Sequence, residues 1–232
     1  MSDILVFAAT YNEKENINNF VNDIFDTSSE IDMLVIDDNS PDETWKILKK
    51  ISENNKKFFF IKRDRKLGLN TAHQMAYDYA ISHSYKKLIT MDADFSHDPK
   101  EIPKIINLLE KYEFVIGSRY VNGGKNVQPL FRYLISYLGN KFIKFLLKSN
   151  FNEFTTSYRG FNLKKLNNFN LNQIKGNGYS FFMETVIALE RLKYKSFEFP
   201  IHFKDRIYGK SKIPKIEIFR TFKNLISLYF KK

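Results

Sequence analysis

Two carboxylates separated by one residue stand at the end of an apolar segment, Leu88-Ile89-Thr90-Met91-Asp92-Ala93-Asp94. Side chains alternate across a β-strand, so Asp92 and Asp94 can point the same way at the carboxyl edge of a sheet, where open α/β folds bind ligands. Carboxylates this close repel each other unless a positive charge lies between them. A hard divalent cation that also binds phosphate oxygens meets this need. The spacing therefore predicts a site for a metal-bound nucleotide diphosphate, although acidic pairs at strand ends also occur in ordinary loops.

Acidic and aromatic side chains also follow the first two apolar segments. Tyr11 and Glu13 come after the segment 4–9. Tyr11 can stack on a base and Glu13 can bind a sugar hydroxyl, or both can form a turn with a favourable first-turn acid. Asp37 and Asp38 end the segment 33–36. An acid at this place in nucleotide-binding folds often binds a ribose hydroxyl or a base edge, and the alternative is capping of the next helix.

Basic residues are predicted near the same edge. Arg119 follows the apolar segment 114–117, where it can hold a phosphate or form a salt bridge with a nearby acid. Arg206, Lys210 and Lys212 lie in a glycine-containing loop that can close over a pyrophosphate, although charged surface loops are common.

Several other kinds of site are disfavoured. The first predicted strand is not followed by Gly-x-Gly-x-x-Gly, and the chain has no Walker lysine loop, which argues against a dinucleotide oxidoreductase and a P-loop enzyme. No Ser-His-Asp arrangement is evident. The histidines lack metal-ligand spacing. We interpret His73, His83 and His97 as surface residues or supports for the site, and His202 as structural.

These residues need a sheet to bring them together. Strands are predicted at 4–9, 33–36, 58–61, 87–91 and 114–117, with helical patterns between them. Ser40, Pro41 and Glu43 predict a capped helix start after the second strand. Continuous apolar strands that alternate with helices predict an α/β fold with a mostly parallel, doubly wound sheet and helices on both faces.

The second half of the chain has a different pattern. An amphipathic helix is predicted through 131–146, followed by a helix at 179–192, a strand at 197–201 and a last amphipathic helix through 218–229. Arg132, Ser136 and Asn140 form a polar stripe beside the apolar stripe of the first of these helices, a pattern that usually marks a solvated face. Both amphipathic helices can pack on the core or lie in an anionic membrane interface.

The composition narrows the class of protein. The 232 residues are 43% hydrophobic, which fits one large globular domain, and the absence of cysteine excludes disulfides and fits a reducing compartment. The first residues do not look like a signal peptide, and no stretch reaches the roughly 20 apolar residues of a membrane span. The net charge of +11 favours anionic partners such as phosphates, nucleic acid or acidic lipids.

Taken in order, the motifs carry a family resemblance. They are Ala-Thr-Tyr-Asn-Glu (9–13), Ile-Asp-Asp-Asn-Ser-Pro-Asp (36–42), Leu-Gly-Leu (67–69), Asp-Ala-Asp-Phe-Ser-His-Asp-Pro (92–99), Gly-Ser-Arg-Tyr (117–120) and Asp-Arg-x-x-Gly-x-Ser-Lys (205–212). The chain strongly resembles the inverting family 2 glycosyltransferases over about 4–212, and within them the dolichol-phosphate mannosyltransferase (polyprenol-phosphate glycosyltransferase) group.

The resemblance implies a GT-A fold over residues 1–212, with 213–232 as a C-terminal amphipathic helix. It implies a nucleotide-sugar donor, GDP-mannose or a UDP-hexose, and Mg²⁺ or Mn²⁺ on Asp92 and Asp94. It assigns catalysis to Asp92, Asp94 and Arg119, and the acceptor phosphate to Arg132 and Ser136. The residues that it assigns to the nucleotide sugar are Ala9, Tyr11, Glu13, Ile36, Asp38, Asp92, Ala93, Asp94, Arg119, Arg206 and Lys212.

The sequence departs from the family pattern at a few places. Ala9 replaces a usual proline and Asn39 a common glycine. Glu153 stands where the family has an aspartate one methylene shorter, and Ser96 stands where some relatives have a glutamine that helps bind the metal. A lipid phosphate acceptor is already ionised and needs no strong base. A sugar hydroxyl acceptor needs a carboxylate base, for which Glu153 and Glu184 are candidates.

The resulting expectation is metal-dependent, inverting transfer of a hexose, with mannose favoured, to a polyprenyl or dolichyl phosphate. The protein would be cytoplasmic and peripheral on the cytoplasmic face of a membrane, with a membrane-anchored partner possible and no nucleic acid bound. One rival is a soluble family 2 glycosyltransferase that acts on a sugar hydroxyl in cell-surface polysaccharide. A second rival, a nucleic-acid-binding protein, is disfavoured because acidic strand ends repel a phosphate backbone.

Overall fold

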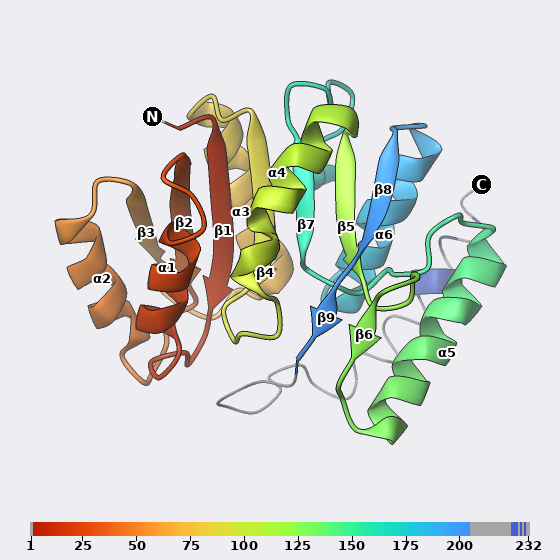
Figure 1. The fold of residues 1–232 in the computed structure, drawn as a ribbon, viewed down its shortest axis with the longest axis horizontal. Coiled ribbons are helices and arrows are strands. Elements are labelled where there is room, and N and C mark those ends of the chain that lie inside the picture. The colour runs from red at the N-terminus through yellow and green to blue at the C-terminus, as the bar shows by residue number, and fades with distance from the viewer. Residues whose placement is uncertain (1, 205–223, 227, 229, 231–232) are drawn as a thin grey trace.

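The computed structural model describes residues 2–204, 224–226, 228 and 230. Within these residues a seven-stranded sheet has the order β3-β2-β1-β4-β7-β5-β8 (Figure 1). The strands of this sheet are β1 (Ile4–Thr10), β2 (Ile31–Asp37), β3 (Phe58–Lys62), β4 (Lys87–Asp92), β5 (Phe114–Ser118), β7 (Arg159–Asn162) and β8 (Ser196–Pro200). A separate two-stranded ladder pairs β6 (Lys125–Asn126) with β9 (His202–Phe203).

The register places the acidic strand ends together. β1 lies between β2 and β4, parallel to both, so Thr10 pairs with Asp37 and Ala9 pairs with Asp92. The carboxyl ends of these strands therefore meet at one edge. β7 runs antiparallel between β4 and β5, and it was not predicted. Its four residues, Arg-Gly-Phe-Asn, carry no apolar alternation, so this strand is specified by its partners and not by its own sequence.

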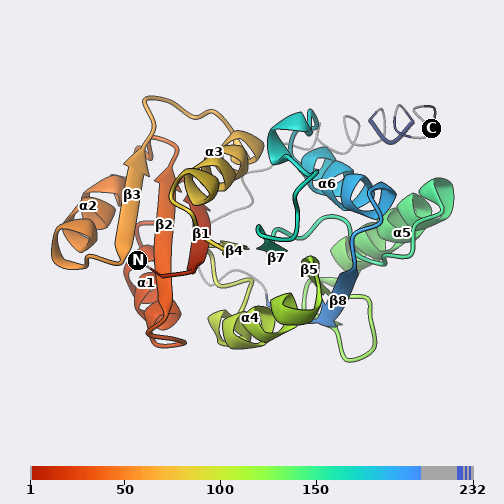
Figure 2. The ribbon, with the colours of Figure 1, turned by 90° about the horizontal axis from the view of Figure 1, so that it is seen from above.

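Helices cover both faces of the sheet, as predicted. Alternate residues of the buried strands face opposite sides, so Val6 and Ala8 join one core and Leu5 and Phe7 join the other. Figure 2 shows α1 and α4 on one side and α3 and α6 on the other. The helices are α1 (Ile17–Phe25), α2 (Thr44–Asn54), α3 (Leu69–Ser82), α4 (Ile102–Lys111), α5 (Leu130–Leu147) and α6 (Tyr179–Arg191), with short 3₁₀ turns η1 (Pro99–Glu101) and η2 (Leu171–Gln173).

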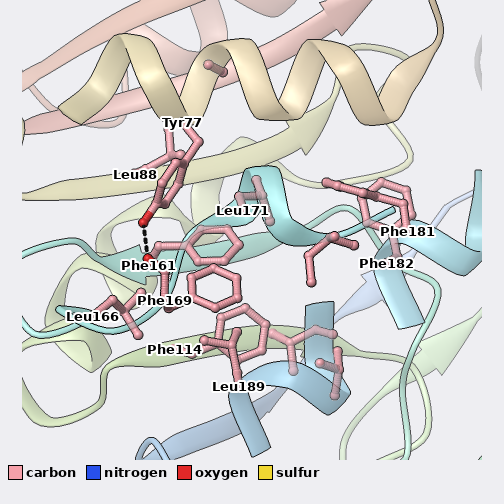
Figure 3. Close-up of a cluster of buried hydrophobic side chains, with 14 of the residues drawn as sticks. Tyr77, Leu88, Phe114, Phe161, Leu166, Phe169, Leu171, Phe181, Phe182 and Leu189 are labelled. Carbon is pink, nitrogen blue, oxygen red and sulfur yellow. Dashed lines mark hydrogen bonds between the residues drawn. The ribbon is translucent and has the colours of Figure 1, made fainter. Parts of the chain in front are cut away.

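An aromatic cluster attaches the second half of the chain to α3 (Figure 3). The Phe161 ring of β7 lies 5.2 Å from the Phe114 ring of β5 and stacks on Phe169. The Tyr77 hydroxyl of α3 donates to the Phe169 carbonyl at 2.8 Å. The loop after β7 is thereby held against the first half of the sheet, so both halves form one core.

The predicted start of α2 is wrong. Ser40 does not cap this helix, because its hydroxyl donates to Asp37 and its oxygen accepts from the Asn12 main-chain N–H. Glu43 has a left-handed backbone with φ of 67°, and regular helix begins only at Thr44. The Asp-Asn-Ser loop therefore joins the first two strand ends to each other instead of capping a helix.

Helix α5 packs with reversed polarity. The polar stripe was interpreted as a solvated face, but Asn140 is only 1% exposed, and Ser136, Tyr133 and Tyr137 are half-buried. The apolar residues are the ones that face solvent, with Phe145 81% exposed. The other exposed apolar residues on this helix are Leu130, Phe131, Leu134, Ile135, Leu138 and Phe142.

Part of the sequence prediction lies outside the described residues. Arg206, Lys210, Lys212 and most of the predicted C-terminal helix belong to this part. Leu225, which is described, is buried against the core. In the described part of the chain, no helix has both the length and the hydropathy that a membrane crossing requires.

Two glycine substitutions test the packing of β7. A Cβ at Gly160 would lie 2.7 Å from methyl groups of Ile105 and Val115, which are stiff at χ1. We expect Gly160→Ala to lower the free energy of unfolding by about 1–3 kcal/mol, measured by urea denaturation. Gly139→Ala is the control, because nothing lies within 4 Å of its Cβ, and the change should raise stability by up to about 1 kcal/mol. Equal stability of the two variants would contradict this packing.

Candidate functional site

The acidic pair lies at the carboxyl end of β4. The Asp92 side chain is 37% exposed, and its Oδ1 accepts from the Ser157 hydroxyl at 2.6 Å. Asp94 is only 5% exposed, and its Oδ1 accepts from the Ser96 main-chain N–H at 3.0 Å. The pair is therefore held in place by its surroundings, with Asp92 the more accessible of the two carboxylates.

His97 supports the acidic pair. Its Nδ1 accepts from the Asp92 main-chain N–H at 3.1 Å, so this nitrogen carries no hydrogen. The hydrogen is then on Nε2, which lies 3.1 Å from the Thr156 hydroxyl. Burial lowers the pKa of His97, which keeps the ring neutral. His97 therefore links the turn after β4 to the segment before β7, in agreement with its interpretation as a support.

His73 is not at the surface, and that interpretation was wrong. Its ring packs edge-on against Phe7 at 5.0 Å and Phe182 at 5.1 Å. Burial lowers the pKa of His73 to about 3, so the ring is a neutral part of the core.

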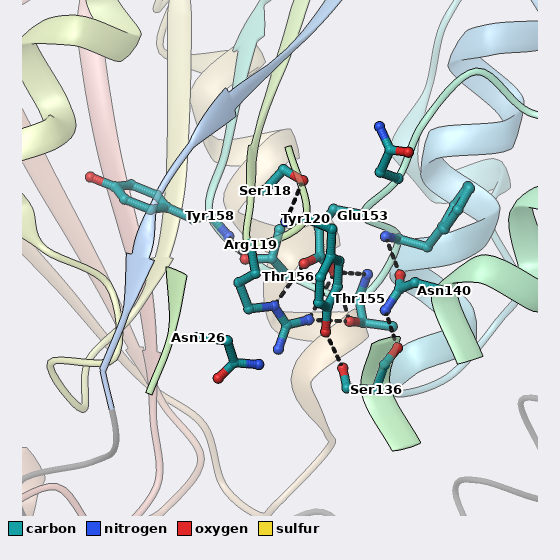
Figure 4. Close-up of polar contacts among 12 residues, drawn as sticks. Ser118, Arg119, Tyr120, Asn126, Ser136, Asn140, Glu153, Thr155, Thr156 and Tyr158 are labelled. Carbon is teal, nitrogen blue, oxygen red and sulfur yellow. Dashed lines mark hydrogen bonds and ion pairs between the residues drawn. The ribbon is translucent and has the colours of Figure 1, made fainter. Parts of the chain in front are cut away.

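Arg119 forms a buried ion pair with Glu153 (Figure 4). Arg119 Nε and Nη2 donate to the two Glu153 oxygens at 2.7 and 2.9 Å, and the Glu153 side chain is 0% exposed. The Arg119 guanidinium also packs on the Tyr120 and Phe203 rings at 5.1 and 5.0 Å. The salt-bridge alternative for Arg119 is thus realised, and Nη1 is left as the nitrogen that makes none of these hydrogen bonds.

The ion pair fixes the charge state of both residues. Burial alone would raise the pKa of Glu153, but the Arg119 guanidinium and the hydrogen bonds from Thr155 outweigh it and hold this pKa below its usual value. Burial would lower the pKa of Arg119, and Glu153 raises it instead. Glu153 is therefore a poor proton acceptor, because its negative charge is stabilised and both of its oxygens are engaged.

The segment 153–157, here called the strap, joins the parts of the site. Thr156 and Ser157 hold His97 and Asp92, and Glu153 holds Arg119. The strap is anchored from below by Arg159, which is 1% exposed and donates to the Thr156 and Phe154 carbonyls at 2.8 and 3.1 Å. Burial lowers the pKa of Arg159 to about 9.

The strap also holds helix α5. Asn140 Oδ1 accepts from the Phe154 main-chain N–H at 2.8 Å, and Asn140 Nδ2 donates to the Ser136 carbonyl at 2.8 Å. The Tyr120 hydroxyl donates to Ser136 Oγ at 2.7 Å. Arg132 lies one turn before Ser136 and is exposed. The sheet edge that carries Arg119 is therefore tied to the helix that carries Arg132 and Ser136.

The ends of β1 and β2 form the other side of the site. The Asp38 carboxylate makes an ion pair with buried Arg63 and accepts from the Gly68 main-chain N–H at 3.1 Å. Lys66 Nζ lies 3.8 Å from the Tyr11 ring centroid. Glu13 is buried and accepts from Asn16 at 2.7 Å. Asp38 and Glu13 are thus already engaged with the protein, and Tyr11 remains half-exposed.

Three of the predicted nucleotide-sugar residues are small or apolar. Ile36 and Ala93 are buried, and Ala9 is partly buried beside Asp92 in the sheet. A ligand contact from Ile36 would have to come from its main chain, because its side chain is 0% exposed. The small side chains of Ala9 and Ala93 keep the edge of the sheet open beside the acidic pair.

The donor set at Asp92 and Asp94 fits a hard divalent cation. Carboxylate oxygens suit Mg²⁺ or Mn²⁺, and a site with few protein ligands leaves coordination positions for phosphate and water. No group of three or more His, Cys, Asp or Glu side chains able to hold a metal occurs in the described residues. Two aspartates with a ligand's phosphates are the arrangement that this donor set allows. Ser96 is buried beside Asp94, so it stays only a candidate for a further contact.

A family model described as glycosyl transferase family 2 matches residues 5–169. The chain belongs to this family. Two curated members match it along most of its length. An undecaprenyl-phosphate mannosyltransferase of Micrococcus luteus is 32% identical over 90% of this chain and 87% of its own length. A polyprenol monophosphomannose synthase of Mycolicibacterium smegmatis is 30% identical over 90% of this chain and 80% of its own length.

Solved structures support the GT-A fold of this family 2 glycosyltransferase. Glucosyl-3-phosphoglycerate synthase from Mycobacterium tuberculosis, in complex with Mn²⁺, UDP and glucosyl-3-phosphoglycerate, matches with a TM-score of 0.70 at 15% identity, over 97% of this chain and 78% of that one. A Pyrobaculum calidifontis mannosyltransferase in complex with GDP-mannose and Mn²⁺ matches with a TM-score of 0.61 at 14% identity, over 99% of this chain and 64% of that one. At these identities the likeness shows the fold alone.

Sequence reasoning missed several supports of the site in this glycosyltransferase. Arg63 was not singled out, although it is buried and pairs with Asp38. Ser157, Tyr120 and Arg159 were seen only as parts of motifs. A lone arginine, serine or tyrosine carries no spacing signal, and their roles depend on strands that are distant in the sequence.

The Arg119–Glu153 pair predicts a specific pH dependence. Glu153→Gln leaves Arg119 buried without its counter-charge, so we expect it to lower the free energy of unfolding by about 3–5 kcal/mol at neutral pH. Because the folded pKa of Glu153 is lowered, the unfolded chain binds the proton first as pH falls. The advantage of the natural protein should therefore shrink below about pH 4.5.

Urea denaturation between pH 3 and 7 measures this difference. Glu43→Gln is the control, because Glu43 pairs with Lys46 on the exposed surface, and its variant should match the natural protein at neutral pH. A difference between Glu153→Gln and the natural protein that stays constant down to pH 3 would contradict the assigned charge state.

Proposed function

We propose that the protein transfers a hexose, with mannose favoured, from a nucleotide diphosphate sugar to a polyprenyl phosphate, with inversion at the anomeric carbon. The observation that carries the proposal is the link between Asp92 and α5. The strap holds Asp92 through Ser157, Arg119 through Glu153 and α5 through Asn140. One support thus positions a carboxylate suited to a donor diphosphate and a helix suited to a lipid acceptor. The names of the two curated relatives support the same reaction.

The donor would lie along the carboxyl ends of β1, β2 and β4. Tyr11, Glu13 and Asp38 would bind the nucleoside, and Arg119 would stabilise negative charge on the departing diphosphate. Mg²⁺ or Mn²⁺ would be held by Asp92 and Asp94 and, when bound, supplies positive charge for the leaving group. The similar solved enzymes that contain Mn²⁺ support this choice. GDP-mannose is the favoured donor, with a UDP-hexose as the alternative.

The acceptor phosphate would bind beside Arg132 and Ser136. A phosphate monoester is ionised at neutral pH, so it can attack without transferring a proton to the protein. The state of Glu153 supports this, since it is paired with Arg119 and its pKa is lowered. Glu184 accepts from the main-chain N–H of Gly176 at 3.0 Å. The transfer to a sugar hydroxyl, which needs a carboxylate base, is therefore less well supported.

The outer face of α5 supports contact with a membrane surface. Its exposed phenylalanine and leucine side chains are accompanied by the exposed basic residues Arg132, Lys141 and Lys148. An apolar stripe flanked by cations is suited to an anionic lipid interface. We place the protein peripherally on the cytoplasmic face of a membrane, with a membrane-anchored partner as a further possibility. The roles of Arg206 and Lys212, and the division into residues 1–212 and 213–232, belong to the same proposal.

Sugar transfer into lipid tests the reaction directly. Radiolabelled GDP-mannose or UDP-glucose is incubated with undecaprenyl phosphate and Mg²⁺ or Mn²⁺, and label is counted in the organic phase. We expect label from one donor, and its loss on EDTA treatment. Asp94→Asn removes a charge at the proposed metal site, so transfer should fall by at least about 100-fold.

Asn18→Asp, on the exposed side of α1, is the matched control and should retain transfer. Metal-dependent donor turnover with a glycan acceptor, and no label in lipid, would overturn the lipid acceptor in favour of a hydroxyl acceptor.

Vesicle binding tests the surface of α5 independently of catalysis. Replacing Phe131, Leu138 and Phe145 together by serine removes exposed apolar area, so sedimentation with anionic phospholipid vesicles should fall by about tenfold or more. Ile81→Ser is the control, because Ile81 is also exposed but lies on α3. Equal binding by both variants would remove α5 from the membrane surface. The urea midpoint of each variant verifies folding.

A further inference from the structure

A buried hydrogen-bond donor without a partner lies in β6. Asn126 Nδ2 is buried and completes no hydrogen bond with the described part of the chain. The opposite end of the amide is engaged, since Asn126 Oδ1 accepts from the Gln128 main-chain N–H at 3.1 Å. This contact decides which end of the amide is the nitrogen. A buried donor left unpaired weakens the folded state, so its presence points to a ligand that completes the bond.

The strand pairing places Asn126 next to the ion pair. Asn126 pairs with Phe203 of β9, and the Phe203 ring packs on the Arg119 guanidinium at 5.0 Å. Figure 4 shows the nitrogen end of the Asn126 amide on the side of Arg119 and Ser136. Arg119 already gives Nε and Nη2 to Glu153, so its Nη1 is the nitrogen left for a ligand.

A third donor comes from the Tyr120–Ser136 pair. Burial raises the pKa of Tyr120, so its hydroxyl keeps the hydrogen that it donates to Ser136 Oγ at 2.7 Å. Ser136 then has its own hydrogen to donate elsewhere. The Asn126 side chain also acts on the Tyr120 hydroxyl, which confirms that Asn126 lies beside this pair. Three donors thus surround one small region, and the neighbouring carboxylate of Glu153 is neutralised by Arg119.

We propose that Asn126 is a binding residue for the acceptor phosphate, and that its Nδ2–H donates to a phosphate oxygen beside Ser136 and Arg119 Nη1. The inference rests on the proposed function, because it names a further residue for the same acceptor. A neutral amide is suited to this place, since it adds a donor without another charge next to the ion pair. A carboxylate of the same shape would repel the phosphate.

Binding of farnesyl phosphate tests the proposal without relying on catalysis. Titration calorimetry in detergent compares the full-length natural protein with Asn126→Asp and Asn126→Ala. We expect Asn126→Asp to weaken farnesyl phosphate binding by about ten- to a hundredfold, and Asn126→Ala to weaken it by less. Farnesol lacks the phosphate, so its binding should change less than twofold. Affinity for GDP with Mn²⁺ should also change less than twofold, because the donor side is not altered. Asn18→Asp is the charge control and should bind all ligands normally.

Unchanged farnesyl phosphate affinity in Asn126→Asp would overturn the proposal, as would an equal loss of farnesyl phosphate and GDP binding. The transfer assay separates this outcome from failure of the proposed function. If the natural protein makes no lipid-linked sugar but binds farnesyl phosphate through Asn126, the proposed reaction fails and the phosphate site stands. If it transfers sugar and Asn126→Asp keeps the natural KM for undecaprenyl phosphate, the reaction stands and the role of Asn126 is overturned.

Discussion

The buried ion pair between Arg119 and Glu153 is the interaction on which the rest of the site depends. Removing two charges from water costs several kcal/mol per ion unless the pair is well aligned and further hydrogen bonds are made. Here the guanidinium meets both carboxylate oxygens, Thr155 donates to the same carboxylate through its hydroxyl and its main chain, and two aromatic rings cover the arginine. The pair joins the end of β5 to the strap, which lies more than thirty residues later in the chain.

Once the strap is fixed, its other residues have little freedom. Thr156 and Ser157 meet His97 and Asp92, and Asn140 of α5 receives the main chain at Phe154. Arg159 holds the same segment from the core side. A carboxylate of the acidic pair and the helix beside it are therefore positioned by one short segment. A change that loosens the strap should disturb both together, whereas a change at Asp38 or Tyr11 acts on the nucleoside side alone.

The parts that could be predicted are those that a local pattern specifies. The five strands of the first half are continuous apolar runs that end in polar residues, so their order and the meeting of Asp38, Asp92 and Arg119 at one edge follow from α/β packing. β7 could not be predicted, because a buried arginine and a glycine give it no strand pattern and its place comes from β4 and β5. The extra methylene of Glu153 raised a question that sequence could not answer, and the structure shows that the longer acid reaches Arg119. The roles of Arg206 and Lys212 remain predictions.

The reversed polarity of α5 has a cause in the same network. Asn140 and Ser136 are needed on the inner face to join the strap and Tyr120, so the apolar residues of the helix must face outward. A protein that acts on a water-soluble glycan would gain nothing from this arrangement and would expose a sticky surface. For a lipid phosphate the arrangement is useful, because an α-helix with its side chains is only about 10 Å wide. A phosphate at the inner face and an isoprenoid chain at the outer face would both be within reach of one helix, which favours a lipid acceptor over a hydroxyl acceptor.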